Sequence, residues 1–225
     1  NGVCEIRKFT EIPDYLNPGD CLVRNNSKVI KARIYAYPRS NPERKTEFFL
    51  VQADDPSKKV WSALAKPGKN LKKFREFIAL PPTGKNLSEL VIRVLSLQPL
   101  KIEFSSVDGD VQNLLESYGH IPLPPYIKRS DEKSDHERYQ TIYAKVDGSI
   151  AAPTAGLHFS EEIFRKFSEK GVAVADITLH VGIGTFRPVK VEKISEHKMH
   201  PEYFNIAKAE ADKINTARTR GGRVL

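Results

Sequence analysis

Long apolar runs are the first feature that this sequence lacks. No run approaches the ~20 apolar residues that a membrane-spanning helix requires, and no secretory signal peptide opens the chain. With 40% hydrophobic and 28% charged residues, the composition is typical of a soluble globular protein. We therefore expect a cytoplasmic protein with no membrane association, and we expect it to be a monomer.

Cysteine and several common catalytic motifs are also scarce or missing. The two cysteines, Cys4 and Cys21, form no CxxC pair, which indicates a reducing compartment and argues against a cysteine zinc site. The sequence contains no P-loop, no G-x-G-x-x-G fingerprint and no G-x-S-x-G elbow. These absences exclude several frequent classes of nucleotide-binding and hydrolytic enzymes.

The charge and the length set the remaining bounds. Basic residues outnumber acidic ones by 36 to 28, so the net charge is +8. This balance favours a polyanionic partner, although a solvated basic surface is the default explanation. At 225 residues the chain can form one large domain or two modest ones. Because it begins without methionine and stops in a strand-like segment, we expect both ends to be cut from a longer chain.

Six short β-rich runs separated by turn sequences occupy the region from about residue 29 to 105. They are Ala32–Tyr37, Thr46–Val51, Val60–Ala65, Phe74–Leu80, Leu90–Leu97 and Leu100–Phe104. No helical periodicity interrupts them, so the pattern predicts a small antiparallel six-stranded barrel. Lysines at 58–73 lie among Trp61, Phe74 and Phe77. This mixture can make a nucleic-acid surface, but the simpler interpretation is core aromatics with solvated lysines around them.

The stretch from Ser149 to Val189 is different, with two loops around one helix and one strand. Ser160 is a good helix N-cap, Gly171 ends the helix, and 172–181 reads as a buried strand. The strand breaks at Gly182 and Gly184, where backbone can approach a ligand closely. The pattern predicts a site at the ends of these elements, although an ordinary βαβ fragment with glycine turns has the same spacing.

Weaker signals complete the architecture. We expect strands at Val3–Phe9 and Cys21–Arg24, a loop at Asn25–Lys28, an exposed and mobile charged segment at 130–137, and helices at Val111–Tyr118 and Lys208–Thr219. The character of the sequence changes near Asp108. We therefore predict a discontinuous α/β main domain, residues 1–28 plus 108–225, with the β-barrel domain, residues 29–107, inserted into it.

Histidines raise the question of a metal site. His197, His200 and Glu202 lie close in sequence, but Pro201 interrupts the helical register that would place three ligands on one face. We expect no metal there. His158 and His180 end the two loops and suit a general acid, a general base or a loop-orienting hydrogen bond.

Several motifs in order resemble one known family. They are Tyr139-Gln-Thr-Ile-Tyr-Ala, Ala151-Ala-Pro-Thr-Ala-Gly-Leu-His-Phe159, Leu179-His-Val-Gly-Ile-Gly-Thr-Phe-Arg-Pro188 and His197-Lys-Met-His-Pro-Glu202, with Pro122-Leu-Pro-Pro-Tyr-Ile127, Asn17-Pro-Gly-Asp20 and Val23-Arg-Asn in support. Together they resemble the S-adenosylmethionine:tRNA ribosyltransferase-isomerases of queuosine biosynthesis. The resemblance is specific from about residue 120 to 202 and loose across the barrel.

The resemblance implies a reaction and its partners. The ribosyl part of S-adenosylmethionine is transferred to 7-aminomethyl-7-deazaguanine in a tRNA anticodon loop and isomerised, giving epoxyqueuosine, adenine and methionine. S-adenosylmethionine is then a co-substrate, and no cofactor is permanently bound. A non-catalytic RNA-binding module and a histidine- or metal-dependent hydrolase remain the alternatives.

This chemistry needs proton transfer, a held sulfonium and room for RNA. We expect His158, His180 and Glu162 to serve the proton steps, since imidazole titrates near neutral pH and burial would raise the pKa of Glu162. The expected substrate-binding residues are Thr154, Gly156, Gly182, Gly184, Tyr126, Tyr139, Phe186 and Arg187. The two histidine loops should converge on one pocket. Lys128, Arg129 and Arg138 are the expected tRNA-binding residues.

Overall fold

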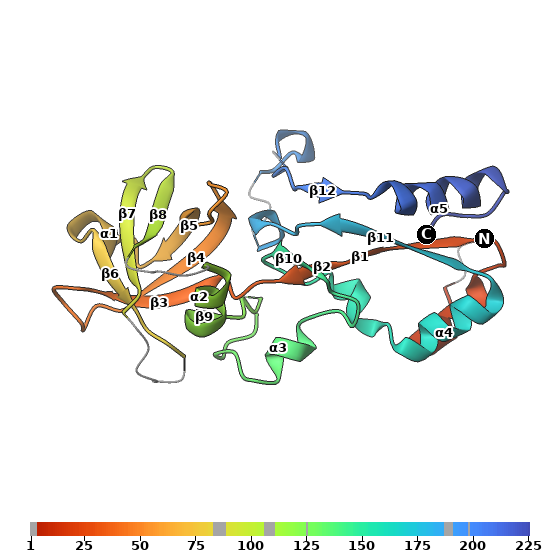
Figure 1. The fold of residues 1–225 in the computed structure, drawn as a ribbon, viewed down its shortest axis with the longest axis horizontal. Helices are drawn as coiled ribbons and strands as arrows, with labels where there is room; N and C mark the ends of the chain where they lie inside the picture. Colours follow the sequence, from red (N-terminus) through yellow and green to blue (C-terminus); the bar gives the residue numbers. More distant parts are fainter. Residues whose placement is uncertain (1–3, 83–88, 106–110, 125, 187–190, 198) are drawn as a thin grey trace. The chain divides into compact units, whose positions relative to one another are not determined.

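The computed structural model describes residues 4–82, 89–105, 111–124, 126–186, 191–197 and 199–225. The chain forms two compact units, each assembled from separated segments (Figure 1). Unit 1 comprises residues 1–29, 137–181 and 199–225, and unit 2 comprises 30–136 and 182–198. No helix within the described ranges is long and apolar enough to cross a membrane. The domain boundaries at 28/29 and 107/108 remain predictions; the compact units group 108–136 and 182–198 with the barrel segment.

Unit 2 contains a closed six-stranded antiparallel barrel, which confirms the predicted fold class (Figure 1). Around the barrel the strands run in the order β3 (Arg33–Pro38), β4 (Thr46–Ala53), β5 (Val60–Lys66), β8 (Leu100–Ser105), β7 (Val91–Leu97) and β6 (Glu76–Ala79). Pairing of β6 with β3 closes the ring, and the short strand β9 (Gly119–His120) adds to β3. Each strand overlaps one of the six β-rich runs of the sequence.

Every second side chain along the strands points into the barrel and fills its interior. Along β3, Ile34 and Ala36 are fully buried while the residues between them are partly exposed, as period-2 geometry requires. Phe48 and Phe77 meet edge to face inside, with ring centroids 5.0 Å apart. Trp61 is also buried. Trp61 and Phe77 are therefore core residues, and no base can stack on them.

One helix interrupts the barrel where none was expected. The short helix α1 (Lys69–Lys73) lies between β5 and β6. Its first turn buries Asn70, whose amide donates to the Thr46 hydroxyl at 2.8 Å. The helix is only 5 residues long, so it has too few positions to show a helical period. Beyond the barrel, helix α2 (Val111–Tyr118) precedes β9 and matches its predicted range.

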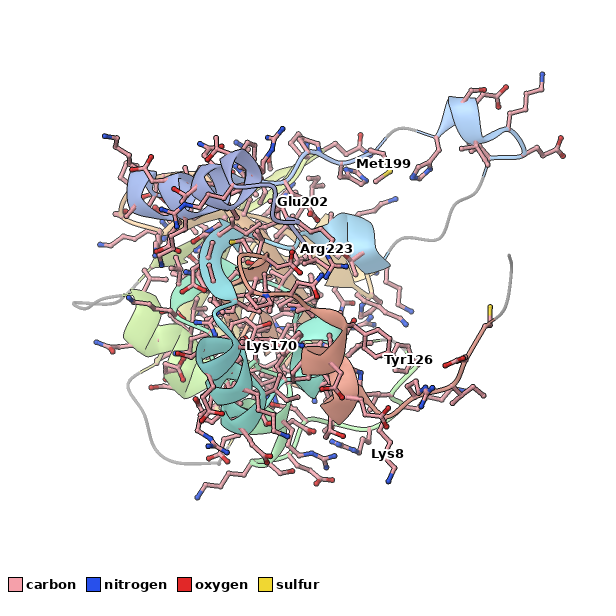
Figure 2. The ribbon with its side chains drawn as sticks, turned by 90° about the vertical axis from the view of Figure 1, so that its right-hand side faces the viewer. Lys8, Tyr126, Lys170, Met199, Glu202 and Arg223 are labelled. Atoms are coloured by element: carbon pink, nitrogen blue, oxygen red, sulfur yellow. The ribbon has the colours of Figure 1, made fainter. Side chains whose placement is uncertain are left out.

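The main sheet of unit 1 joins chain segments far apart in the sequence. Strand β1 (Cys21–Asn25) pairs in parallel with β11 (Ala173–Leu179), and β12 (Phe204–Asn205) pairs antiparallel with β11. On the other side of β1, residues 223–225 run parallel to it and pair with it through hydrogen bonds such as Val23 N to Leu225 O at 2.7 Å. Arg223, labelled with Lys170 in Figure 2, fixes that segment by donating to Asp20.

Helix α4 (Glu161–Lys170) forms where local signals predict it. The Ser160 hydroxyl accepts from the Ile163 amide, and the chain leaves the helix at Gly171 with φ at 75°. The buried face packs Ile163 and Phe167 against Leu16 and Leu22 from the N-terminal segment. Helix α5 (Lys208–Thr219) likewise matches its predicted range.

Three local expectations were wrong. Of the predicted strand Val3–Phe9, the described residues 4–8 have no regular structure, and the 3₁₀ helix η1 (Phe9–Tyr15) begins at Phe9. The predicted loop at 25–28 contains strand β2 (Ser27–Val29), which pairs with β10 (Val146–Ser149). In the charged segment 130–137, Asp135 begins the short helix α3 (Asp135–Arg138) and is buried. A partner distant in sequence causes the second difference, whereas Asp135 is held by its near neighbours Arg129 and Glu132.

Candidate functional site

The loop that carries His158 is held by an aromatic cluster in unit 1. Residues Thr154–His158 form the 3₁₀ helix η2, and a Cβ atom on Gly156 would collide with the Tyr143 hydroxyl and lie 2.8 Å from Thr141 Cγ2. Glycine is therefore required at position 156 by close packing. The His158 ring is exposed and lies 5.3 Å from the Phe9 ring. The loop thus exposes the imidazole of His158 at the surface, while the backbone at Gly156 is tightly packed.

The guanidinium of Arg24 lies over two aromatic rings beside this loop. Arg24 Cζ is 4.4 Å from the ring centroids of both Tyr143 and Phe164, and its Nε donates to Asp176 Oδ1 at 2.6 Å. Burial raises the pKa of the Tyr143 phenol, although the nearby Arg24 charge opposes this effect. A cavity of about 450 Å³ opens here, lined by Arg24, Ile142, Tyr143, Glu161, Phe164 and Val174. Sequence reasoning did not assign Arg24 or Tyr143 to a site, although both fall inside quoted family motifs.

His180 is placed by the end of strand β11. Its ring stacks on Tyr203 with centroids 5.5 Å apart and an 18° interplanar angle, while its backbone amide donates to the Tyr203 carbonyl at 2.9 Å. On the other side lies Gly148, whose φ of +147° favours glycine and whose added Cβ would lie 2.6 Å from His180 Cε1. The neighbouring Ser149 hydroxyl accepts from Val181 N at 2.9 Å. The imidazole is therefore fixed by packing on two sides.

The other expected proton-transfer residue does not have the environment that we required. Glu162 is exposed and makes an ion pair with Lys166 at 3.1 Å, and this hydrogen-bonded lysine lowers the pKa of the carboxyl. It lacks the raised pKa that burial would have produced.

The expected substrate-binding residues have varied surroundings. Thr154 is exposed, Tyr126 is 76% exposed at the surface (Figure 2), and Tyr139 is buried. Gly182 and Gly184 belong to unit 2 rather than unit 1. Arg187 and the side chain of Phe186 lie outside the described residues. Convergence of the two loops on one pocket remains a prediction.

The expected tRNA-binding residues differ in whether their positive charges are already paired within the protein. Lys128 and Arg138 are exposed. Arg129 donates to both carboxylate oxygens of Asp135, at 2.6 and 2.9 Å. Because Asp135 is buried and depends on this pair, Arg129 has a structural role that competes with phosphate binding.

Potential metal ligands are not grouped in the parts of the chain that the structure describes. There, no three His, Cys, Asp or Glu side chains are arranged so that they could hold an ion. His197 belongs to unit 2, whereas His200 and Glu202 belong to unit 1. That the three residues bind no metal remains a prediction.

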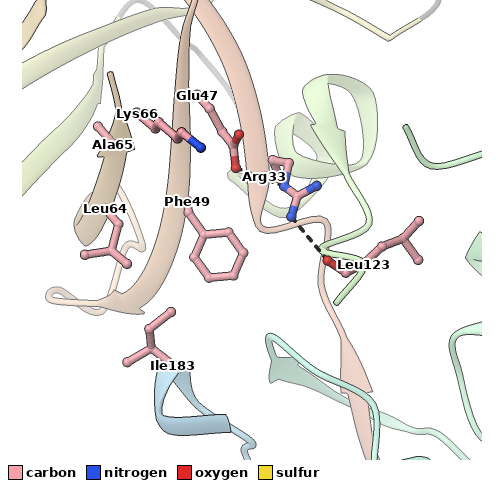
Figure 3. Close-up of a pocket in the computed structure, with 8 residues that line it drawn as sticks. All are labelled: Arg33, Glu47, Phe49, Leu64, Ala65, Lys66, Leu123 and Ile183. Carbon is pink, nitrogen blue, oxygen red and sulfur yellow. Dashed lines mark hydrogen bonds and ion pairs between the residues drawn. The ribbon is translucent and has the colours of Figure 1, made fainter. Parts of the chain in front are cut away.

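A second cavity lies in unit 2, against the barrel wall. It has a volume of about 470 Å³ and is lined by Arg33, Glu47, Phe49, Leu64, Ala65, Lys66, Leu123 and Ile183 (Figure 3). Arg33 Nη2 donates to the Leu123 carbonyl at 3.3 Å, and Glu47 Oε1 lies 3.1 Å from Arg33 Nε. Sequence reasoning assigned none of these eight residues to a site, but Ile183 stands between the predicted Gly182 and Gly184.

Comparison with known proteins shows that this chain is similar to proteins of queuosine biosynthesis. Residues 1–225 match the family model described as queuosine biosynthesis protein. Over its whole length the chain is 48% identical to the S-adenosylmethionine:tRNA ribosyltransferase-isomerase of Clostridioides difficile, and the alignment covers 63% of that protein. It is 43% identical to the Finegoldia magna protein of the same name, of which the alignment covers 62%. A crystal structure of S-adenosylmethionine tRNA ribosyltransferase from Thermotoga maritima aligns at 25% identity and a TM-score of 0.31, over 96% of this chain and 54% of that one. The chain spans less than two thirds of the length of these curated relatives. It belongs to the family of queuosine biosynthesis proteins.

Proposed function

We propose that the protein containing this chain is an S-adenosylmethionine:tRNA ribosyltransferase-isomerase. It transfers the ribosyl part of S-adenosylmethionine to 7-aminomethyl-7-deazaguanine in tRNA and isomerises it to epoxyqueuosine, with release of adenine and methionine. The observation that carries this proposal is the match of residues 1–225 to the family model, with 48% identity to a relative of that name.

The reaction makes demands that the described residues can meet. A base must remove a proton next to the sulfonium, and adenine must leave with the electron pair of its glycosidic bond and take up a proton. His180 is the stronger candidate for one of these proton steps, because Tyr203 and Gly148 restrict its ring to one orientation. His158 is the second candidate, since its ring is exposed at the end of a tightly packed loop. The exposed, ion-paired Glu162 is the weakest of the three.

The tRNA partner accounts for the excess of basic residues. The target base belongs to an anticodon loop, where it must leave its stack to reach an active site. Exposed cations such as Lys128 and Arg138 are suited to phosphate contacts, and the +8 net charge favours association with any polyanion.

The test is release of adenine. Full-length protein is incubated with S-adenosylmethionine and with tRNA that carries the deazaguanine precursor, and free adenine and methionine are measured by chromatography. We expect one adenine per modified tRNA, no release with tRNA that lacks the precursor, and no effect of a chelator. Formation of S-adenosylhomocysteine in place of adenine would show methyl transfer and overturn the proposal. Loss of activity with chelator would favour the metal-dependent alternative.

A further inference from the structure

The outer face of the barrel carries two rows of side chains that cross neighbouring strands. Antiparallel partners point to the same face of a sheet, and the inward positions of β3 and β4 are those of Ile34, Phe48 and Leu50. One outward row runs from Arg33 through Phe49 to Leu64, and the next runs from Tyr35 through Glu47 to Lys66. The apolar pair Phe49 and Leu64 therefore lies beside Glu47 and Lys66, which bear charges of opposite sign, with Arg33 at the end of the apolar row.

All residues of these rows except Tyr35 line one wall of the 470 Å³ cavity, and other segments of unit 2 complete it (Figure 3). Leu123 lines one edge, and Ile183 approaches from the glycine motif that follows His180 in sequence. The volume falls within the roughly 300–1,000 Å³ typical of small-molecule sites. A mainly apolar lining with a few polar groups is also typical of such sites.

A buried polar atom in the cavity lacks a hydrogen-bond partner. Arg33 Nε is buried, and no described residue accepts a hydrogen bond from it. Glu47 Oε1 lies 3.1 Å away and balances its charge, but the pair does not have hydrogen-bond geometry. A buried donor without an acceptor costs free energy, and a ligand oxygen would remove that cost. Lys66, which is exposed at the same rim, adds a second cation.

The edge of the cavity is held rigidly by a histidine–aspartate pair. Strand β9 pairs His120 with Arg33, and Asp131 accepts from His120 Nδ1 at 2.6 Å and from Ile121 N at 3.0 Å. His136 Nε2 lies 3.4 Å from the same carboxylate, and the Asp131 side chain is only 6% exposed. This network fixes the segment that ends at Leu123, whose carbonyl accepts from Arg33. The site is thus preorganised on both sides of Arg33.

We propose that this barrel-wall cavity binds S-adenosylmethionine, with the adenine ring against Phe49 and Leu64 and the amino-acid end at Glu47, Arg33 and Lys66. The inference rests on the proposed function for the identity of the ligand. Charge complementarity supports the assignment: the ligand carries an ammonium and a sulfonium that suit the Glu47 carboxylate, and a carboxylate that suits Arg33 and Lys66. Phe49 and Leu64 supply apolar surface for a purine.

The first test fills the cavity. Leu64 is 41% exposed on the outer wall, so Leu64→Trp should fold normally and occupy the space of the adenine ring. The matched control is Leu95→Trp, on β7, which is 48% exposed and does not line the cavity. By calorimetry on the full-length protein, we expect Leu64→Trp to raise the Kd for S-adenosylmethionine at least tenfold and Leu95→Trp to leave it within twofold. Equal affinity in wild type and Leu64→Trp would overturn the assignment.

The second test separates the two ends of the ligand. Glu47→Gln removes the negative charge but keeps the size, and Glu103→Gln on β8 is the control. Glu47→Gln should weaken S-adenosylmethionine binding about five- to fiftyfold while adenosine, which lacks the amino-acid end, binds as to wild type. If both ligands weaken equally, or neither does, the proposed orientation is wrong.

Measuring adenine release in parallel keeps this inference distinct from the proposed function. If wild type releases adenine and Leu64→Trp has an unchanged KM for S-adenosylmethionine, the cavity assignment fails while the function stands. If wild type binds S-adenosylmethionine in the cavity but releases no adenine with substrate tRNA, the function fails while the binding site stands.

Discussion

Gly148 leaves the space that the imidazole of His180 occupies, although the two residues are 32 positions apart in the chain. A Cβ at Gly148 would lie 2.6 Å from His180 Cε1 and 2.8 Å from Nδ1. Stacking on Tyr203 closes the opposite side. The orientation of the proposed catalytic imidazole is therefore decided by a glycine in β10 and a tyrosine just before β12.

Replacing this glycine should displace the imidazole. We expect Gly148→Ala to lower the rate of adenine release at least tenfold and to destabilise the fold by about 1–3 kcal/mol, since strain at φ > 0 adds to the collision. Gly221→Ala is the matched control, because Gly221 has φ at +81° but nothing within 4 Å of an added Cβ. Gly221→Ala should lose some stability and keep its activity. An active Gly148→Ala protein would show that the position of His180 does not matter.

The guanidinium of Arg24, which lies over two aromatic rings, leads to a second prediction. Lysine keeps the charge but loses the broad guanidinium contact with Tyr143 and Phe164 and the Nε bond to Asp176. Arg24→Lys should cost about 1–2 kcal/mol in the free energy of unfolding, measured with urea. Arg165→Lys, at an exposed i,i+4 pair with Glu169, should cost less than about 0.5 kcal/mol. Equal losses in the two variants would contradict a special contribution from the contacts of Arg24 with the two rings.

The pair formed by Asp20 and Arg223 makes stability depend on pH. Hydrogen bonds from the Arg223 side chain, and then from backbone amides, hold the pKa of Asp20 well below its usual range. The folded-state pKa is thus below the unfolded value of about 3.9. The stability that the pair contributes is complete above that value and is lost as the pH falls through the folded-state pKa.

Asp20→Asn tests this linkage. The variant should be less stable than wild type at pH 7 and at pH 5, and the difference should shrink below about pH 4, where wild-type Asp20 begins to lose its advantage. Asp14→Asn, at an exposed position of η1, is the control. Urea unfolding at several pH values provides the measurement, and a difference that stays constant down to pH 2 would refute the assignment.

The tRNA surface can be tested without disturbing a buried carboxylate. Reversing Arg129 would remove the cation that balances the buried Asp135 carboxylate, so we choose Lys128→Glu with Arg138→Glu. The double variant should weaken tRNA binding and reduce the salt slope by about one unit of log K per lost phosphate contact, with S-adenosylmethionine affinity unchanged. Reversal of Lys58, Lys59 and Lys73 on the barrel is the comparison. If that triple variant abolishes binding and the double variant does not, the RNA binds the barrel instead.

Local signals in the sequence were sufficient for much of the fold. Helix α4 could be predicted because its cap at Ser160, its apolar stripe and its final Gly171 all act within one or two turns. The six barrel strands could be predicted because alternation and turn residues lie close together along the chain. The family motifs could likewise be read from the sequence, because each is a short contiguous stretch.

Only the tertiary structure decided which distant residues meet. Strand β2 exists because it pairs with β10, more than 100 residues later in the chain, and helix α1 is too short to show a period. Arg24 lies over the rings of Tyr143 and Phe164, and the barrel-wall cavity depends on the register of β3, β4 and β5. A one-residue slip in that register would turn Phe49 and Glu47 inward. Such contacts depend on packing and register between segments far apart in the sequence. The local preferences that indicate a helix or a strand contain no information about which distant segments pair.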